Sequence, residues 1–306
     1  MSIRSNAKMG SVIFKRPPLR KLRKEGLFGV DMHFHTNYSL DAVSKIPNAI
    51  RKAEKKGFGF AITDHNTIDG VLAAYKLGRA AVIIPGIEVT CKNGNHVLVY
   101  CHTKGQLEEL FKKDIKPKMK TPFFVDLSVS ELIEAAGDYD SIISAAHPYS
   151  PGVTGMMRTG VTKQIERKLD LIEAMNGFST RKSNLKAVYW SSKIDKHVSG
   201  GSDAHSTLAL GKVMTFTKGR NAESVLDEVC KGKSIIIGKE DNLFMKAVRV
   251  VRKESAYINR SKKQQLGKEL IKMQFGNEYK FLCDKFKNGA AYKMFTQRHE
   301  NDQGSD

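Results

Sequence analysis

The sequence predicts an α/β fold, and more specifically a barrel of β/α units, from two observations. Short apolar runs alternate with helix-like patterns from Gly29 to Ile237, which is typical of strands and helices that build a mainly parallel sheet. About seven such units follow one another over roughly 210 residues, and this length fits a barrel better than an open, doubly wound sheet.

Each element has its own signal in the sequence. Short apolar runs bounded by turn residues predict strands, and a capping residue before helically spaced apolar residues predicts a helix. Pro47 suits the first turn of one helix and Gly57 the position just past its end, while Ser128 and Glu131 form a capping box before another. The expected strands span 29–35, 58–63, 82–89, 96–101, 141–146, 170–175, 198–202, 213–217 and 234–237, and the expected helices span 47–56, 69–80, 128–136, 184–196 and 222–231.

The chain divides into three expected parts: a basic N-terminal arm at 1–26, the α/β domain at 27–240 and a basic C-terminal extension at 241–306. Residues 1–24 are expected to be loosely ordered, because they are polar and basic and Pro17-Pro18 interrupts them. The extension is expected to be helical in parts.

Composition narrows the class of protein. The net charge of +19 favours phosphate-bearing partners, although a lysine-rich surface also simply keeps a protein soluble. No apolar run approaches the roughly 18 residues of a membrane span, and no signal-peptide segment follows the basic N-terminus. The four cysteines form no Cys-x-x-Cys pair, which indicates reduced thiols. We therefore expect a cytoplasmic protein that has no membrane partner.

Residues of the kinds that bind metals stand at the ends of the expected strands. His33 and His35 lie two apart on a strand and can therefore point at one ion. Because strand ends converge at one face of a β/α barrel, ligands far apart in the sequence can meet in one pocket. The candidates at strand ends are His33, His35, His65, Glu88, His96, His147, Asp203 and His205.

This set of residues predicts a metal site of a particular kind. A lone histidine at a strand end is more often a surface or hydrogen-bonded residue than a ligand, but most of the nine histidines lie in these motifs. Nitrogen and carboxylate donors without thiolates suit Zn, Mn or Fe, and they argue against a calcium site or a thiolate zinc finger.

Taken together, the motifs resemble those of the PHP (polymerase and histidinol phosphatase) family. The resemblance rests on Asp31-x-His33-x-His35, Asp41, Thr63-Asp64-His65-Asn66, Gly86-Ile87-Glu88, His96, His147-Pro148 and Gly201-Ser202-Asp203-x-His205, in this order across residues 29–206. It implies a distorted seven-stranded β/α barrel with two or three divalent metal ions (Mn, Zn or Fe).

The resemblance also implies roles for individual residues. His33, His35, Glu88 and Asp203 would hold one ion; Glu88 would bridge to a second, held with His96 and His147; Asp41, His65 and His205 would hold a third. Glu88, Asp203 and His205 are the candidate catalytic residues. Asp64 would either orient a neighbouring ligand or cap a turn.

Three further residues are candidates for contacts with substrate. Arg158 lies on a glycine-bearing loop after the His147 strand, and Arg181 follows the strand that ends near Asn176. Arginine suits bidentate contact with phosphate, although a loop arginine is more often simply solvated. Asn176 is the third candidate.

Three hypotheses for function follow. The first is a metal-dependent phosphoesterase that hydrolyses phosphate esters of nucleotides or short nucleic acids, as a nucleotide phosphatase or exonuclease. The second is a small-metabolite phosphatase of the histidinol-phosphate type. The third is a nucleic-acid-binding accessory protein whose metal site is structural. The basic termini favour the first over the second, because positive charge attracts polyanions.

Overall fold

The computed structural model describes residues 11–150, 154–242, 245–246, 248 and 251. The chain divides into Met1–Arg260 and Ser261–Asp306, and the second unit lies outside the described residues. Most of the C-terminal extension, with its expected helices, therefore lies outside them too. No helix in the described ranges has the length and apolarity to cross a membrane.

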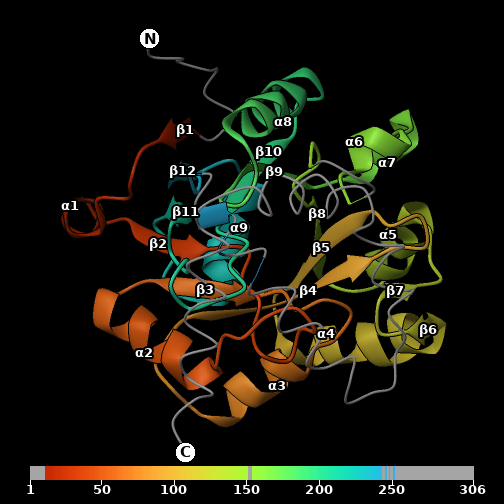
Figure 1. The fold of residues 1–306 in the computed structure, drawn as a ribbon, viewed down its shortest axis with the longest axis horizontal. Helices are drawn as coiled ribbons and strands as arrows, with labels where there is room; N and C mark the ends of the chain where they lie inside the picture. The colour runs from red at the N-terminus through yellow and green to blue at the C-terminus, as the bar shows by residue number, and fades with distance from the viewer. Residues whose placement is uncertain (1–10, 151–153, 243–244, 247, 249–250, 252–306) are drawn as a thin grey trace, which may run out of the picture. The chain divides into compact units, whose positions relative to one another are not determined.

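One curled sheet forms the centre of the fold (Figure 1), and it has ten strands in the described residues, where the family resemblance implied a seven-stranded barrel. Nine of the ten lie where the sequence predicts strands, and the tenth comes from the N-terminal arm. Their order in the sheet is β1 (Ser11–Phe14), β12 (Ile235–Gly238), β11 (Val213–Thr217), β2 (Phe28–Asp31), β3 (Gly59–Ile62), β4 (Ile83–Thr90), β5 (His96–Cys101), β8 (Ser141–Ala145), β9 (Leu171–Asn176) and β10 (His197–Gly201).

The sheet mixes parallel and antiparallel pairs. β2, β3 and β4 are parallel neighbours, as are β8, β9 and β10, whereas β5 runs antiparallel to both β4 and β8. The sheet curls far enough that Met32 N donates to Gly200 O at 3.4 Å, which brings the end of β10 beside the end of β2. The result is an α/β fold with a partly closed barrel.

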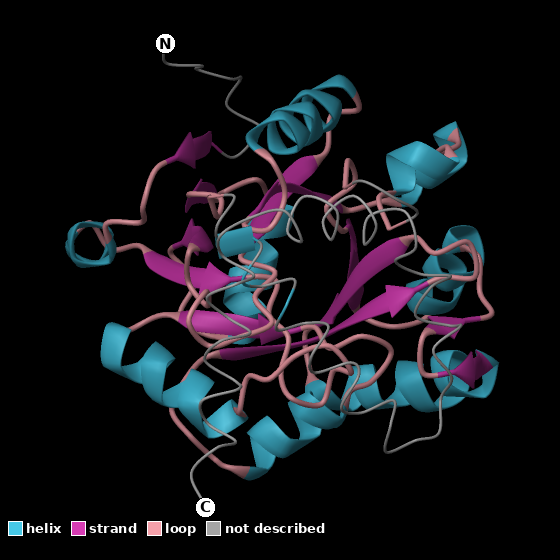
Figure 2. Cartoon of the chain, viewed as in Figure 1, coloured by secondary structure: helices cyan, strands magenta, loops and turns pink. Residues whose placement is uncertain are grey.

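Most helices lie around the outside of the curled sheet, whereas α9 lies in the middle of the view, where Val225, Leu226 and Val229 pack in one cluster with residues of the strands (Figure 1 and Figure 2). Helix α2 has a proline in its first turn and ends at Gly57, whose φ of 65° is left-handed, and α5 begins with the expected capping box at Ser128. The helices are α1 (Leu19–Lys24), α2 (Ile46–Lys56), α3 (Asp69–Lys76), α4 (Lys104–Leu110), α5 (Val129–Gly137), α6 (Met156–Thr159), α7 (Lys163–Lys168), α8 (Arg181–Lys193) and α9 (Ala222–Cys230), with a π-helical turn at Phe111–Ile115, a 3₁₀ turn at Lys116–Lys118 and a small hairpin of β6 (Met119–Thr121) and β7 (Phe124–Val125).

The N-terminal arm is ordered from Ser11 onward, so the expectation of loose order was wrong for residues 11–24. Strand β1 pairs in parallel with β12, and α1 follows it. Leu22 is buried in the main core, and Arg23 Nη2 donates to Gly57 O at 3.3 Å. The arm is ordered because Leu22 packs in the core and the backbone of β1 pairs with β12. A basic composition alone does not reveal these contacts.

The interior is apolar where sheet and helices meet. Phe34 and Phe60 pack edge to face with ring centroids 5.4 Å apart, and Ile62 and Ile87 are buried beside them in the same core cluster. This close packing holds the strands in fixed positions. The polar residues at one edge of the sheet are therefore held on a rigid support.

Candidate metal centre

The nine side chains predicted as ligands come together at one edge of the sheet. Most of these residues follow the carboxyl end of a strand, but His96 is the first residue of its strand, β5. Since β5 is antiparallel, its first residue lies opposite Thr90 at the end of β4. In the described residues, donor atoms within 4.8 Å of one another form overlapping groups made of His33, His35, Asp41, His65, Glu88, His96, His147, Asp203 and His205.

Four donor atoms form a first set. His33 Nε2 and His35 Nε2 are 3.1 Å apart, and each lies 3.3 Å from Glu88 Oε2. Asp203 Oδ1 lies 3.3 Å from His35 Nε2 and 3.7 Å from His33 Nε2. Donors that share a tetrahedral ion at about 2.1 Å stand about 3.4 Å from one another. The spacing of the two imidazoles from each other and from Asp203 therefore fits one small divalent ion, and Glu88 lies at a similar distance from both rings.

Glu88 turns its two carboxylate oxygens toward different partners. Oε1 lies 3.0 Å from His96 Nδ1 and 3.0 Å from His147 Nε2. Oε2 faces the two histidines after β2 and also lies 3.1 Å from His65 Nδ1. A carboxylate in this position can bridge two ions, which is the role that the sequence resemblance implies for Glu88.

A third set lies around Asp41. Its Oδ2 is 3.1 Å from His205 Nε2 and 3.4 Å from His65 Nε2. Ser39 Oγ donates to the other oxygen, Oδ1, at 2.8 Å and so fixes the carboxylate. His65 thus faces Glu88 with one ring nitrogen and Asp41 with the other.

Buried atoms at the centre support the fit of metal ions to these residues. Glu88 Oε2 is buried, and no described residue hydrogen-bonds to it, although several ring nitrogens stand 3.1–3.3 Å away. A buried acceptor without a hydrogen bond costs about 1–3 kcal/mol, and a cation between these atoms would relieve that cost. The donor set of imidazoles and carboxylates suits Zn, Mn or Fe.

Two of the candidate ligands have a strained backbone. The φ angle is 25° at His147 and 49° at Asp203, in the left-handed region that residues with a Cβ rarely adopt. Asn66, beside His65, has a φ of 52°. Such strain costs of the order of 1–3 kcal/mol per residue and collects at functional sites. Here it turns the chain sharply where each strand ends.

Glu173 supports the centre and was missed by the sequence analysis. Its Oε1 lies 3.0 Å from His33 Nδ1, and its Oε2 accepts from His147 N at 2.7 Å and from Asn176 Nδ2 at 3.0 Å. The available signal was a glutamate in the middle of the apolar run Leu171–Asn176, every residue of which is buried. A carboxylate behind a ligating imidazole fixes the tautomer and the orientation of the ring.

Two further aspartates hold the backbone around the centre. Asp64 accepts from Thr36 N at 2.5 Å and from Thr36 Oγ1 at 2.6 Å, which favours the turn-capping reading of this residue. Asp31 accepts from Ser202 N and Gly211 N, both at 2.7 Å. Burial raises the pKa of each of these two carboxyl groups to about 6.

Charges compensate one another within the centre. Burial opposes ionisation, but the surrounding histidines outweigh it and hold the pKa of Glu88 and of Asp203 well below the usual range. Burial also opposes a charge on His35, yet Asp203 and Glu88 raise its pKa to about 9. Burial dominates at His96 and lowers its pKa to about 4. The carboxylates therefore stay ionised and available to a cation.

The three expected substrate residues have different surroundings. Asn176 is buried, and its Nδ2 donates to Glu173 Oε2 and, at 3.2 Å, to Asp203 Oδ2. Arg181 pairs with Glu240 through Nε–Oε1 at 2.5 Å and Nη2–Oε2 at 2.8 Å. Arg158 is exposed on α6. Asn176 thus supports a candidate ligand, and Arg181 already has a carboxylate partner.

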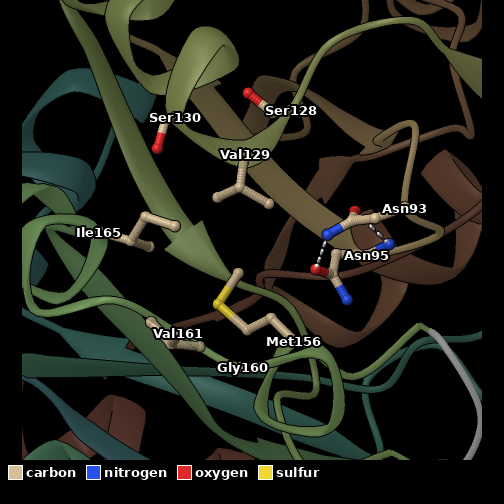
Figure 3. A pocket seen from close by; sticks show the side chains of 9 residues that line it. All are labelled: Asn93, Asn95, Ser128, Val129, Ser130, Met156, Gly160, Val161 and Ile165. Carbon is tan, nitrogen blue, oxygen red and sulfur yellow. Dashed lines mark hydrogen bonds between the residues drawn. The ribbon is translucent and has the colours of Figure 1, made fainter.

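A small hollow lies beside the strand that begins at His96, and Figure 3 shows the residues around it. Its volume of about 100 Å³ suits a few water molecules and is too small for a nucleotide. Its lining is Asn93, Asn95, Ser128, Val129, Ser130, Met156, Gly160, Val161 and Ile165, and it includes none of the nine candidate ligands.

Comparisons with protein families give two matches. The model of the PHP domain matches residues 31–172, and the model described as PHP-associated matches residues 181–234. Together the two matches cover well over half of the 306-residue chain. No curated protein matches the sequence.

Several solved structures share the fold. A two-domain protein from Bacteroides vulgatus, containing a predicted PHP-like metal-dependent phosphoesterase, has 14% identity and a TM-score of 0.53, with 77% of this chain and 70% of that chain covered. PsfC from Pseudomonas syringae has 19% identity and a TM-score of 0.56, covering 75% and 98%. The lesion-specific endonuclease EndoQ from Pyrococcus furiosus has 21% identity and a TM-score of 0.55, covering 69% and 57%. This chain thus spans little more than half of that endonuclease.

Proposed function

The chain belongs to the PHP domain family, and from this premise we propose that it is a metal-dependent phosphoesterase that cleaves phosphate esters in nucleic acids or nucleotides. One observation carries the proposal: Glu88 faces His96 and His147 with one oxygen and the histidines after β2 with the other. A carboxylate in this position would hold two cations within reach of a single phosphate group.

The residues of the chain would divide the work of hydrolysis. Metal ions bound here would neutralise the charge of the phosphate and lower the pKa of a bound water. His33, His35 and Asp203 would hold one side of the centre, and His96 and His147 the other. Asp41 and His205 would hold a third ion. Glu173 keeps the ring of His33 in place through its Nδ1.

The positive charge supports nucleic acid or nucleotides as the substrate class. The chain carries 51 lysines and arginines against 32 acidic residues, and such an excess attracts polyanions. EndoQ, which has a similar fold, is described as a lesion-specific endonuclease, and another endonuclease Q structure holds a 27-mer duplex substrate with an abasic lesion. The sequence also places Arg158 as a candidate phosphate ligand after the His147 strand, and this remains part of the proposal.

A substrate screen tests the proposal. The full chain with added manganese would be offered single- and double-stranded oligonucleotides, mononucleotides and histidinol phosphate. We expect oligonucleotides or nucleotides to be hydrolysed with the highest kcat/KM. We expect Glu88→Gln to lower kcat at least about a hundredfold, because the substitution removes the negative charge that both groups of metal ligands share.

The matched control is Glu223→Gln, the same chemical change at an exposed position in the first turn of α9. It should keep wild-type kcat. Preference for histidinol phosphate would point to a small-metabolite phosphatase. Binding of oligonucleotides without hydrolysis of any ester would point to an accessory protein and would contradict the proposal.

A further inference from the structure

We propose that the exposed face of α8, together with Tyr149, binds a single nucleic acid strand next to the metal centre. This α8 surface consists of Tyr149, Arg181, Lys182, Leu185, Lys186 and Tyr189, which line a hollow of about 720 Å³. The volume lies within the range of roughly 300–1,000 Å³ that ligand sites occupy. The inference rests on the proposed function and names the part of the protein that holds its substrate.

An exposed ring, Tyr189, and a half-buried ring, Tyr149, on this surface are suited to stacking with bases, with an aliphatic side chain beside them. Tyr189 is 70% exposed and Leu185 46%, and their spacing of four residues places them on the same face of α8. The ring of Tyr149 is held edge-on by Trp190, with centroids 6.4 Å apart. Single strands bind through aromatic side chains on which successive bases stack, whatever the sequence.

The charges of the same face match a phosphate backbone. Helix α8 has the sequence RKSNLKAVYWSSK, with four basic residues and no acidic one. Glu240 neutralises Arg181, but no carboxylate among the described residues lies within ion-pair distance of the exposed Lys182 or Lys186. Lys186 Nζ lies 5.7 Å from the centroid of the Tyr149 ring, so amine and ring share one site. Rings and amines on one surface favour a nucleic acid strand over an apolar protein partner.

Both sides of the hollow are attached to candidate metal ligands. On one side, Tyr149 is two residues after His147, and Ser150 N donates to His147 O at 2.8 Å. On the other side, Asn184 of α8 accepts from Asn176 N and donates to Asn176 O, each at 3.1 Å. The Asn176 side chain in turn donates to Asp203. A strand on the α8 surface would therefore lie on the loop that follows His147 and on a helix that is connected to Asp203 through Asn176.

Binding and cleavage of a labelled single-stranded oligonucleotide test the inference in the full, manganese-loaded protein. In Tyr189→Ser we expect about 5- to 150-fold weaker binding by fluorescence anisotropy, whereas Tyr189→Phe keeps the ring and should bind within about twofold of wild type. In the double variant Lys182→Gln/Lys186→Gln, the slope of log affinity against log salt should become shallower by about 1.4, or 0.7 for each lost phosphate contact.

The matched control removes the same charge elsewhere. Lys55→Gln/Lys76→Gln changes exposed lysines of α2 and α3, which lie on the opposite side of the sheet from α8 in Figure 1. It should leave the salt slope within about 0.3 of wild type, because these lysines lie far from the hollow. Thermal unfolding and metal content of each variant would show whether the fold and the centre are intact.

The possible outcomes separate this inference from the proposed function. If wild type cleaves the oligonucleotide and the α8 variants bind and cleave it equally well, the α8 surface is refuted and the proposed function stands. If wild type hydrolyses mononucleotides but binds no oligonucleotide at low salt, the α8 surface is refuted and the proposed function stands. If wild type hydrolyses histidinol phosphate alone and binds no oligonucleotide, both are refuted. If Tyr189→Phe binds as weakly as Tyr189→Ser, stacking is refuted as the basis of binding.

Discussion

Replacement of Glu173 by glutamine should weaken metal binding while leaving the fold intact. A metal on His33 Nε2 leaves the proton of that ring on Nδ1, which then donates to Glu173 Oε1 at 3.0 Å. The other oxygen of Glu173 accepts from His147 N and from Asn176 Nδ2. Glutamine has only one oxygen, and those two donors require it. Its NH₂ group would therefore face the N–H of His33.

The size of the effect follows from this mismatch. Two donors that face each other force the ring of His33 to turn or to move its proton to Nε2, the atom that faces Glu88 and His35. Loss of a partner behind a ligating histidine typically costs 10- to 100-fold in metal affinity. For Glu173→Gln this corresponds to about 1.4–2.7 kcal/mol of binding free energy.

The assay is a titration of chelator-stripped protein with manganese, followed by calorimetry. Glu173→Gln should bind 10- to 100-fold more weakly than wild type, while Glu223→Gln, on the exposed first turn of α9, should bind normally. Melting of both metal-free variants near the wild-type temperature would show that the fold is retained. Wild-type manganese affinity in Glu173→Gln would refute the argument that this carboxylate orients His33.

Three further predictions concern packing, order and pH. Gly201→Ala places a Cβ 2.4 Å from His33 Cβ and should abolish manganese binding, whereas Gly137→Ala, in open space, should not. Leu22→Ala should lower the free energy of unfolding by about 2–4 kcal/mol in urea titrations, and no change would mean that the arm is not packed. Because the pKa values of His33 and His35 are raised without metal, that of His35 to about 9, manganese affinity should rise as pH increases from 6 to 9; a flat profile would contradict these shifts.

Much of the candidate centre could be predicted because its residues follow short apolar runs. The spacing of His33 and His35 on one strand and the turn after β10 at Asp203 are local features that a sequence displays directly. His96 was also identified, although it begins its strand. Only the structure explains its position, because the antiparallel direction of β5 depends on pairing with β4 and β8 and not on local sequence.

Other features depend on contacts that no local pattern reveals. Glu173 lies in a strand that reads as apolar, and its role emerges only when His33, 140 residues earlier, lies beside it. The strand β1 is ordered by the edge of β12, more than 200 residues later in the chain. Helix α4 was missed although its signal is local: the capping box of Thr103 and Gln106 is followed by Leu107, Leu110 and Phe111 at helical spacing.

The central claim is that hydrolysis depends on cations held around Glu88. Its most direct test is a manganese titration of chelator-treated protein in which bound metal per chain and oligonucleotide hydrolysis are measured on the same samples. We predict no hydrolysis in the metal-free protein and a rise in rate as the donor sets that share Glu88 fill. Full hydrolysis in a sample shown by elemental analysis to contain no metal would contradict the claim.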